Sequence, residues 1–78
     1  EMNKSESPTL RELREQNKKT LSEVAKALGV TIRAVSNYEQ GIRKLNIEQL
    51  IPLSQFYDVD IEEIILAQLQ SIFVRKSQ

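Results

Sequence analysis

The chain has 78 residues, 28% of them charged, with eleven basic and eleven acidic side chains and a net charge of zero. It has neither cysteine nor histidine, which excludes disulfides, thiolate metal sites, cysteine nucleophiles and histidine general bases. The N-terminus is polar and no apolar run approaches the roughly 20 residues of a membrane span, so a single-domain, intracellular protein is expected.

The N-terminal part predicts a tail followed by a short helix. Residues 1–6 are polar and are expected to be disordered. The helix is predicted to begin at Ser7–Pro8 and to run to about residue 16, because serine is a good N-cap and proline suits the first helical position. Asn17 is expected to supply a left-handed turn after it. The buried side of this helix would consist of Leu10 and Leu13.

Residues 20–41, TLSEVAKALGVTIRAVSNYEQG, predict two short helices joined by a tight turn. Thr20 and Glu23 form a capping box at the start of the first helix. Gly29 is placed to adopt the left-handed conformation that ends a helix, and Thr31 caps the second helix. The apolar stripe of the first helix comprises Leu21, Val24, Ala25 and Leu28.

The second of these helices, over residues 31–40, has an apolar and a polar side when its residues are placed on a helical wheel. The apolar side comprises Ala34, Val35 and Tyr38. The polar side comprises Ile32, Arg33, Ser36, Asn37 and Gln40. In a major groove, arginine contacts guanine, asparagine contacts adenine, and an apolar side chain contacts the thymine methyl group. We therefore interpret Ile32, Arg33, Ser36 and Asn37 as residues that contact DNA bases.

Contacts to DNA phosphates are predicted around the same helix pair. Arg43 and Lys44 follow the second helix directly and are placed to bind phosphates. The first helix begins at Thr20–Leu21, where its free backbone N–H groups suit an anion. The complete predicted phosphate-binding set is Thr20, Leu21, Thr31, Gln40, Arg43 and Lys44.

The charges of the chain are unevenly distributed along it. Residues 18–44 contain six basic and two acidic side chains, whereas residues 46–78 contain five acidic and two basic ones. A basic helix-turn-helix half and an acidic C-terminal half are therefore expected, although ordinary scatter of charge gives the same kind of pattern.

Two motifs in this stretch resemble the phage-repressor-like helix-turn-helix family, of the Xre or Cro type. They are the A-x-x-x-G-V turn at residues 25–30 and the segment V-S-x-Y-E-x-G at residues 35–41. The resemblance extends over about residues 10–66. It implies an all-α, five-helix, lambda-repressor-like fold, binding of double-stranded DNA, and no cofactor or metal. It also implies an ion pair between Arg14 and Glu39 that ties the first helix to the second helix of the motif.

The chain departs from the family pattern at several positions. The family usually has glycine near Lys18, an apolar residue at Lys19 and proline near Leu45. The packing around Lys19 is therefore expected to differ from that of the family. A glutamine that often contacts a phosphate in the family is Leu21 here, so only the backbone at that position is expected to do so.

Two further helices are predicted after residue 45. Asn46 and Gln49 form a capping box for a helix whose core-facing side would comprise Ile47, Leu50, Ile51, Ser54, Phe56 and Tyr57. A turn follows at residues 58–60. Asp60 and Glu63 form a third predicted capping box, and the last helix is expected to run from Ile61 to about Val74.

The apolar residues of the last helix cover about 200° of its circumference, more than the roughly 100° that packing on one side needs. Leu66, Leu69 and Phe73 are left over, and such an exposed strip is usually an interface. We therefore predict a DNA-binding domain over residues 7–66 and a helical extension over residues 67–78 that forms a homodimer. Two alternatives stay open: residues 69–74 fold back on their own domain, or they lead to a further C-terminal domain.

The sequence thus predicts a DNA-binding transcriptional regulator, with repression as the expected role, that binds an inverted repeat as a homodimer in a bacterial cytoplasm. No membrane association is expected. The alternative is a protein-interaction module on the same fold, including an antitoxin that binds both a toxin and its own operator. An enzyme is not expected, since no group of residues forms a catalytic constellation.

Overall fold

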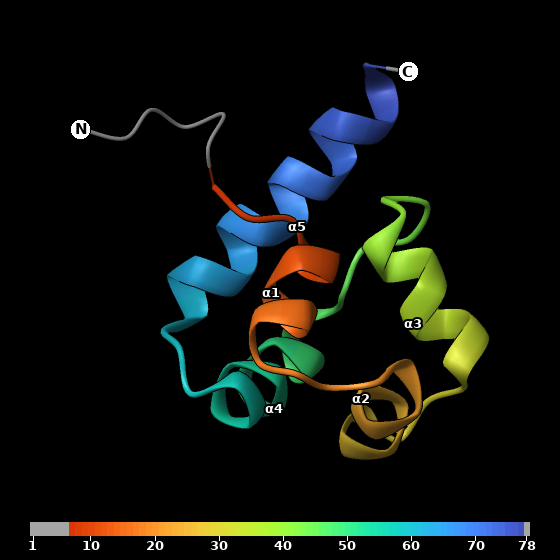
Figure 1. The fold of residues 1–78 in the computed structure, drawn as a ribbon, viewed down its shortest axis with the longest axis vertical. Helices are drawn as coiled ribbons and strands as arrows, with labels where there is room; N and C mark the ends of the chain where they lie inside the picture. The colour runs from red at the N-terminus through yellow and green to blue at the C-terminus, as the bar shows by residue number, and fades with distance from the viewer. Residues whose placement is uncertain (1–6, 78) are drawn as a thin grey trace.

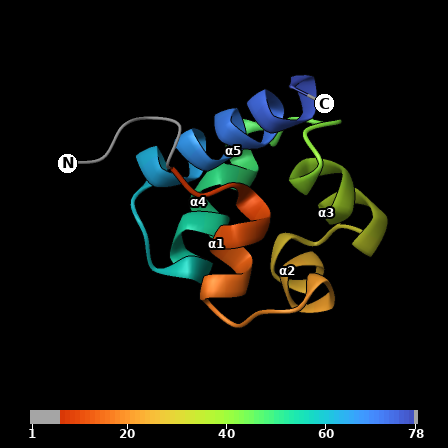
Figure 2. The same ribbon diagram turned by 45° about the horizontal axis from the view of Figure 1, so that its top comes forward.

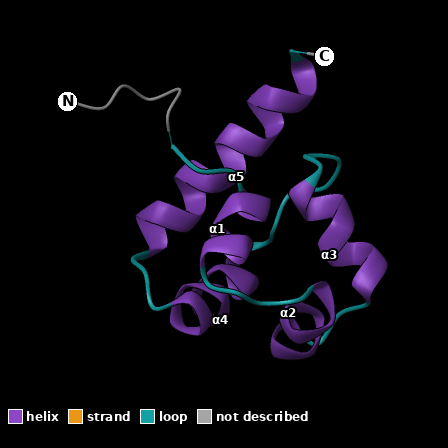
Figure 3. Cartoon of the chain, in the orientation of Figure 1, coloured by secondary structure: helices purple, strands orange, loops and turns teal. Residues whose placement is uncertain are grey.

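The computed structural model describes residues 7–77, so the tail predicted over residues 1–6 lies outside the described part. Within residues 7–77 every regular element is an α-helix (Figure 3). The helices are α1 (Leu10–Gln16), α2 (Leu21–Leu28), α3 (Ile32–Glu39), α4 (Ile47–Tyr57) and α5 (Ile61–Lys76). The prediction of an all-α, five-helix fold is confirmed. None of these helices is both long and apolar enough to cross a membrane.

The helices pack so that α2 and α3 lie together and α5 crosses the rest of the molecule. Helix α2 packs on α3 and α4, while α5 packs on α1, α4 and α3. In both Figure 1 and Figure 2, α2 and α3 form one corner, and α5 runs across the top from α4 towards the end of α3. The helix-turn-helix therefore projects from a base formed by α1, α4 and α5.

One apolar core holds the five helices together. Ile64 of α5 and Val35 of α3 are its largest fully buried side chains, and full burial of such a side chain stabilises a fold by about 1.5–3 kcal/mol. The remaining buried apolar residues are Leu10, Leu13, Val24, Ala25, Ala34, Tyr38, Leu45, Leu53, Tyr57 and Ala67. The core thus anchors the inner side of α3 directly.

The predicted start of α1 at Ser7–Pro8 is wrong, because the helix begins at Leu10 after the N-cap Thr9. The Thr9 hydroxyl accepts the Glu12 N–H at 3.2 Å, and the Glu12 carboxylate accepts the Thr9 N–H at 2.9 Å. If Ser7 were the N-cap, the third helical position would be Leu10. A leucine side chain has no acceptor for the backbone N–H of the N-cap residue, so a capping box could not form there.

The capping boxes predicted for α2 and α4 are confirmed, and the one predicted for α5 is wrong. Thr20 with Glu23, and Asn46 with Gln49, each make both bonds of the box. Asp60 makes no side-chain cap bond. The Glu63 N–H instead donates to the backbone oxygen of Asp60 at 2.9 Å, so the donor that the Asp60 side chain would cap is already satisfied.

The turn after α1 also differs from the prediction. Asn17 keeps φ −92°, and its side-chain amide donates to the Leu13 carbonyl at 2.8 Å. The left-handed residue is Lys18, with φ 58°, at a cost of about 1–2 kcal/mol for a residue with a Cβ atom. The next residue, Lys19, places its Nζ 5.1 Å from the centre of the Phe56 ring. This cation–π contact takes the place of the apolar side chain expected there.

Helix α4 faces the core with most of the predicted residues, but two of the six are exposed. Ile47 is 76% exposed and Ile51 is 50% exposed, so both were wrongly assigned to the core. The prediction is confirmed for Ser54 and Tyr57, which are buried, and for Leu50 and Phe56, which pack against the core. It missed Leu53, which is also buried. Since Ile47 and Ile51 are four residues apart, they share one edge of the helix and leave the core together.

Helix α5 packs on its own domain well beyond residue 66 and ends at Lys76 instead of Val74. Its inner side buries Ile64, Ala67 and Ser71. The Ser71 hydroxyl accepts the Leu10 N–H at 3.0 Å and donates to the Ala67 carbonyl at 2.9 Å. The second half of α5 therefore holds the first turn of α1 while its opposite side faces solvent.

Candidate functional site

The turn between α2 and α3 sets the direction in which α3 leaves the core. Gly29 has φ 69°, and nothing lies within 4 Å of the place where a Cβ atom would stand. The Val30 N–H then donates to the Ala25 carbonyl at 3.0 Å, and Val30 packs against the core. Thr31 accepts the Ala34 N–H at 3.0 Å and starts α3. The predicted order of glycine, inward valine and capping threonine is confirmed.

Helix α3 separates an apolar inner side from a polar outer side. Ala34, Val35 and Tyr38 are buried, and the Tyr38 hydroxyl accepts a hydrogen bond from Gln49 at 3.0 Å. Ile32 and Arg33 are exposed, whereas Ser36 and Asn37 are half-buried. The four predicted base-contacting residues therefore lie together along the outer side of one helix.

The side chains of α3 near its end have partners that hold the outer side in place. The Gln40 amide donates to the Ser36 hydroxyl at 2.8 Å. The Asn37 carbonyl accepts the N–H groups of Ile42 and Arg43 at 2.9 and 3.2 Å, which closes the turn after the helix. These bonds involve only the backbone carbonyl of Asn37.

The predicted phosphate-binding residues lie at the starts of α2 and α3 and around the end of α3. Thr20 and Thr31 are N-cap residues whose hydroxyls accept backbone N–H groups. The Arg43 guanidinium lies 5.6 Å from the centre of the Tyr38 ring, a cation–π contact that restrains it. Lys44 and Gln40 are exposed, and Leu21 is half-buried.

Arg14 and Glu39 form a two-point ion pair between α1 and α3. Arg14 Nε lies 2.7 Å from Glu39 Oε2, and a second nitrogen lies 3.2 Å from Oε1. A third nitrogen donates to the Lys19 carbonyl at 3.0 Å. The side chains are only 14% and 8% exposed. The hydrogen bonds that Arg14 donates to the Glu39 carboxylate raise the pKa of Arg14 above its ordinary value. Burial raises the pKa of the neighbouring Tyr57.

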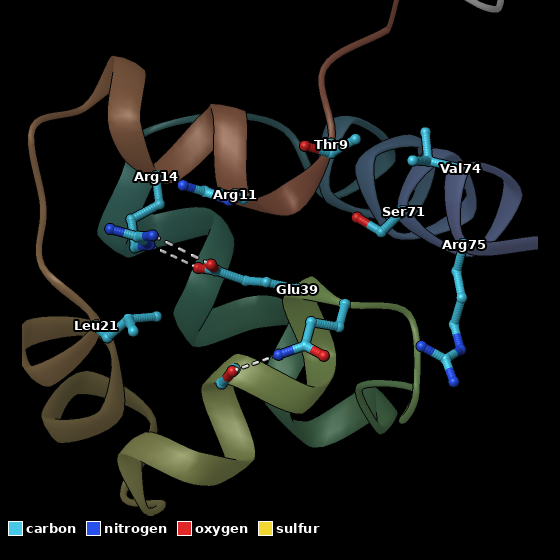
Figure 4. A pocket seen from close by; sticks show the side chains of 10 residues that line it. Thr9, Arg11, Arg14, Leu21, Glu39, Ser71, Val74 and Arg75 are labelled. Carbon is cyan, nitrogen blue, oxygen red and sulfur yellow. Dashed lines mark hydrogen bonds and ion pairs between the residues drawn. The ribbon is translucent and has the colours of Figure 1, made fainter. Parts of the chain in front are cut away.

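A groove of about 410 Å³ opens between α1, α3 and α5, next to this ion pair (Figure 4). Ser36 and Gln40 form part of its wall, so it adjoins the outer side of α3. Of its charged lining residues, the sequence-based prediction missed Arg11 and Arg75. Arg75 was counted with the acidic C-terminal half, but α5 folds back and brings it to the basic side of the molecule.

The outer face of α5, which we define as Leu66, Leu69 and Phe73, is 48–59% exposed. Ala67 and Ser71 lie on the opposite, buried side of the same helix. The alternative in which residues 69–74 pack on their own domain is therefore correct for the inner side of this segment, but Leu69 and Phe73 on the outer face remain exposed. Among residues 7–77, no group of side chains is arranged to hold a metal ion.

Comparison with known protein families finds one match: a model described as helix-turn-helix fits residues 10–64, more than half of the chain. The match covers α1 to α4 and the first residues of α5, including every predicted DNA-contacting residue. No curated protein and no solved structure shows significant similarity to the chain.

Proposed function

Because the chain belongs to the Xre/Cro-type helix-turn-helix family of DNA-binding transcriptional regulators, we propose that it represses transcription by binding an inverted-repeat operator as a homodimer. One observation carries the proposal: the polar outer side of α3 projects from the domain while its inner side is anchored in the core. In this proposal the protein acts on bacterial DNA at the nucleoid, and its binding to DNA requires no cofactor.

In this proposal α3 enters the major groove. Arg33 and Asn37 are one helical turn apart and would each form hydrogen bonds with a base edge, as arginine does with guanine and asparagine with adenine. Ile32, half exposed at the start of the helix, would contact a thymine methyl group. Ser36, which already accepts a bond from Gln40, would contact a base through its remaining hydrogen-bonding capacity.

Phosphate contacts on both sides of the groove would fix the position of α3. The N-terminus of α2 would contact one strand through the backbone N–H of Leu21 and the hydroxyl hydrogen of Thr20, because the Thr20 N–H already donates to Glu23. Thr31, Gln40, Arg43 and Lys44 would hold the backbone near α3 and the turn that follows it. Arg43 is suited to this because its contact with Tyr38 restrains the guanidinium before DNA arrives.

The homodimer in this proposal forms through the outer face of α5, as an extension of the DNA-binding domain over residues 67–78. A two-fold pair would place its two α3 helices about 34 Å apart, one turn of DNA. Leu69→Asp would place a charge in that contact. We expect the variant to sediment as a monomer, while Val74→Asp, which adds the same charge on the groove side of α5, keeps the dimer mass. An unchanged mass for Leu69→Asp would exclude this face as the dimer contact.

Selection of bound sequences from a random DNA pool, at near-physiological salt, tests the function directly. We expect an enriched inverted repeat, with half-sites one helical turn apart. Enrichment of a single half-site would leave DNA binding intact and contradict the dimer. No enrichment with a folded protein would contradict sequence-specific binding itself.

A protein-interaction module, or an antitoxin that also binds a toxin, is the second candidate, and the exposed apolar residues of α4 and α5 favour it. Salt separates the two functions. Binding to several phosphates weakens steeply as salt rises, whereas binding through an apolar surface depends little on salt. A complex that persists unchanged from low to high salt would therefore favour a protein partner.

A further inference from the structure

The groove between α1, α3 and α5 is positively charged. Three guanidinium groups, of Arg11, Arg14 and Arg75, line it, and Glu39 is the one carboxylate among its lining residues. Ser36 and Gln40 form the wall on the side of α3. An anion that lies along the outer side of α3 therefore passes over an excess of positive charge.

The three arginines differ in how far they are committed to other groups. Arg14 directs three nitrogens to Glu39 and to the Lys19 carbonyl, so its charge is largely balanced within the fold. Arg11 pairs with Glu15 at 3.1 Å, but both side chains are more than half exposed, and a pair in that setting is weak. Within residues 7–77, Arg75 has no carboxylate partner.

The direction of Arg75 follows from its place on α5. It lies four residues after the buried Ser71, and so it continues the inner side of the helix past the end of the domain. In Figure 4, Arg75 stands on one side of the groove, and Arg11 and Arg14 stand on the other. The outer face of α5 points away from the groove, so a dimer through that face leaves Arg75 accessible.

We propose that Arg75 binds a phosphate of the DNA backbone in this groove, with Arg11 on the opposite wall, so that α5 adds a phosphate contact to those of the helix-turn-helix. This rests on the proposed DNA-binding function. Arginine suits the task because its planar fork offers parallel N–H donors to phosphate oxygens. Arg75 itself lies outside the matched family segment, which ends at residue 64.

The test is a salt titration of binding to the duplex enriched in the selection, with wild type, Arg75→Ala and Lys76→Ala. Each phosphate neutralised contributes about 0.9 to the slope of log affinity against log salt concentration. We expect Arg75→Ala to reduce the slope by about that amount and to weaken binding to all duplexes alike. Lys76 lies seven residues after Leu69, on the outer side of α5, so its removal takes away the same charge without touching the groove.

Two results would overturn the inference: an unchanged slope for Arg75→Ala, or an equal loss for Arg75→Ala and Lys76→Ala, which would indicate a general effect of charge. Arg75→Lys should keep the slope, because it keeps the charge. Sedimentation and circular dichroism of each variant show that mass and helix content are retained. If the wild-type protein binds no duplex, the proposed function itself is wrong. If the wild-type protein binds DNA and Arg75→Ala binds with the same affinity and salt slope, only the Arg75 contact is refuted.

Discussion

Helices α3 and α5 pack against the same core but present different surfaces to solvent. Helix α3 buries Ala34, Val35 and Tyr38, and its largely polar outer side has Ile32 and Arg33 exposed with Ser36 and Asn37 half-buried. Helix α5 buries two small side chains together with Ile64, and its outer face is apolar. Both helices thus bury apolar side chains in the core, but the solvent side of α3 is largely polar and that of α5 is apolar.

This difference indicates two kinds of partner. A polar surface on a firmly anchored helix suits a hydrated, charged partner such as duplex DNA, whose contacts are largely hydrogen bonds and ion pairs. An apolar strip gains from losing water, which favours another protein surface. The turn after α3 lies close to α5, since a Cβ atom at Gly41 would stand 2.8 Å from the Ser71 carbonyl oxygen, so the two surfaces belong to neighbouring, packed helices.

The two sides of α5 should differ most in their effect on folding stability. Ile64 is fully buried, so Ile64→Ala should lower the free energy of unfolding by about 2–5 kcal/mol. Leu66→Ala, on the outer face, should change it by less than about 0.5 kcal/mol when the protein is dilute enough to be monomeric. Urea unfolding at low concentration measures both. Equal losses would mean that the outer face is packed within the monomer.

The junction of α3 with α5 can be tested with a pair of glycines. Both have positive φ, so alanine at either costs about 1–2 kcal/mol. A Cβ atom at Gly41 would also stand 2.8 Å from the Ser71 carbonyl oxygen, whereas Gly29 has open space. Gly41→Ala should therefore lose about 1–3 kcal/mol more than Gly29→Ala in thermal or urea unfolding. Similar losses would show that α5 can move away from the turn.

Substitutions on α3 and in the turn after it should distinguish base contacts from phosphate contacts. Arg33→Ala should cost about 1–3 kcal/mol in binding and remove the preference at one base position, whereas Lys44→Ala should weaken all sequences alike. Affinities for the selected duplex and for single-base variants of it measure both effects. If Arg33→Ala weakened every duplex equally, Arg33 would not be a base-contacting residue.

The smallest expected effect is on folding stability and lies at the N-terminal cap of α2. The N–H of Thr20 donates to the Glu23 carboxylate and lowers the pKa of Glu23 below its ordinary value. The pKa of Glu23 is lower in the folded protein than in the unfolded chain, where it is about 4.3. The ionised carboxylate therefore adds its full stabilisation above the unfolded-state pKa. This stabilisation is lost as the pH falls through the folded-state pKa. Wild type should exceed Glu23→Gln in stability at pH 7 and match it near pH 3. A difference that stays constant with pH would contradict this.

The helix-turn-helix could be predicted well because its determinants are local. A cap such as Thr20 with Glu23, the left-handed Gly29, and the spacing of Val35 and Tyr38 each depend on residues within one or two turns. The resemblance to a family then supplied the one long-range contact that was foreseen, between Arg14 and Glu39, which lie together in the structure.

The parts that could not be predicted depend on tertiary contacts. The sequence around Ile47 does not show that this side of α4 faces solvent. Which side of α4 is buried depends on the positions of α2 and α5, which pack against it. The left-handed residue fell on Lys18 because the Asn17 side chain bonds the preceding helix. The groove position of Arg75 likewise follows from the packing of Ser71 against α1, which joins residues 61 positions apart.

The bond from the Leu10 N–H to the Ser71 hydroxyl has a consequence for hydrogen exchange. The first amides of a helix ordinarily have no partner within it and exchange quickly with solvent. Here the first amide of α1 is covered by α5 and is buried, so it should exchange only when the end of α5 detaches. The exchange rate of this single amide therefore reports how often the C-terminal helix opens, and slower exchange on adding DNA would show that the bound duplex holds α5 in place.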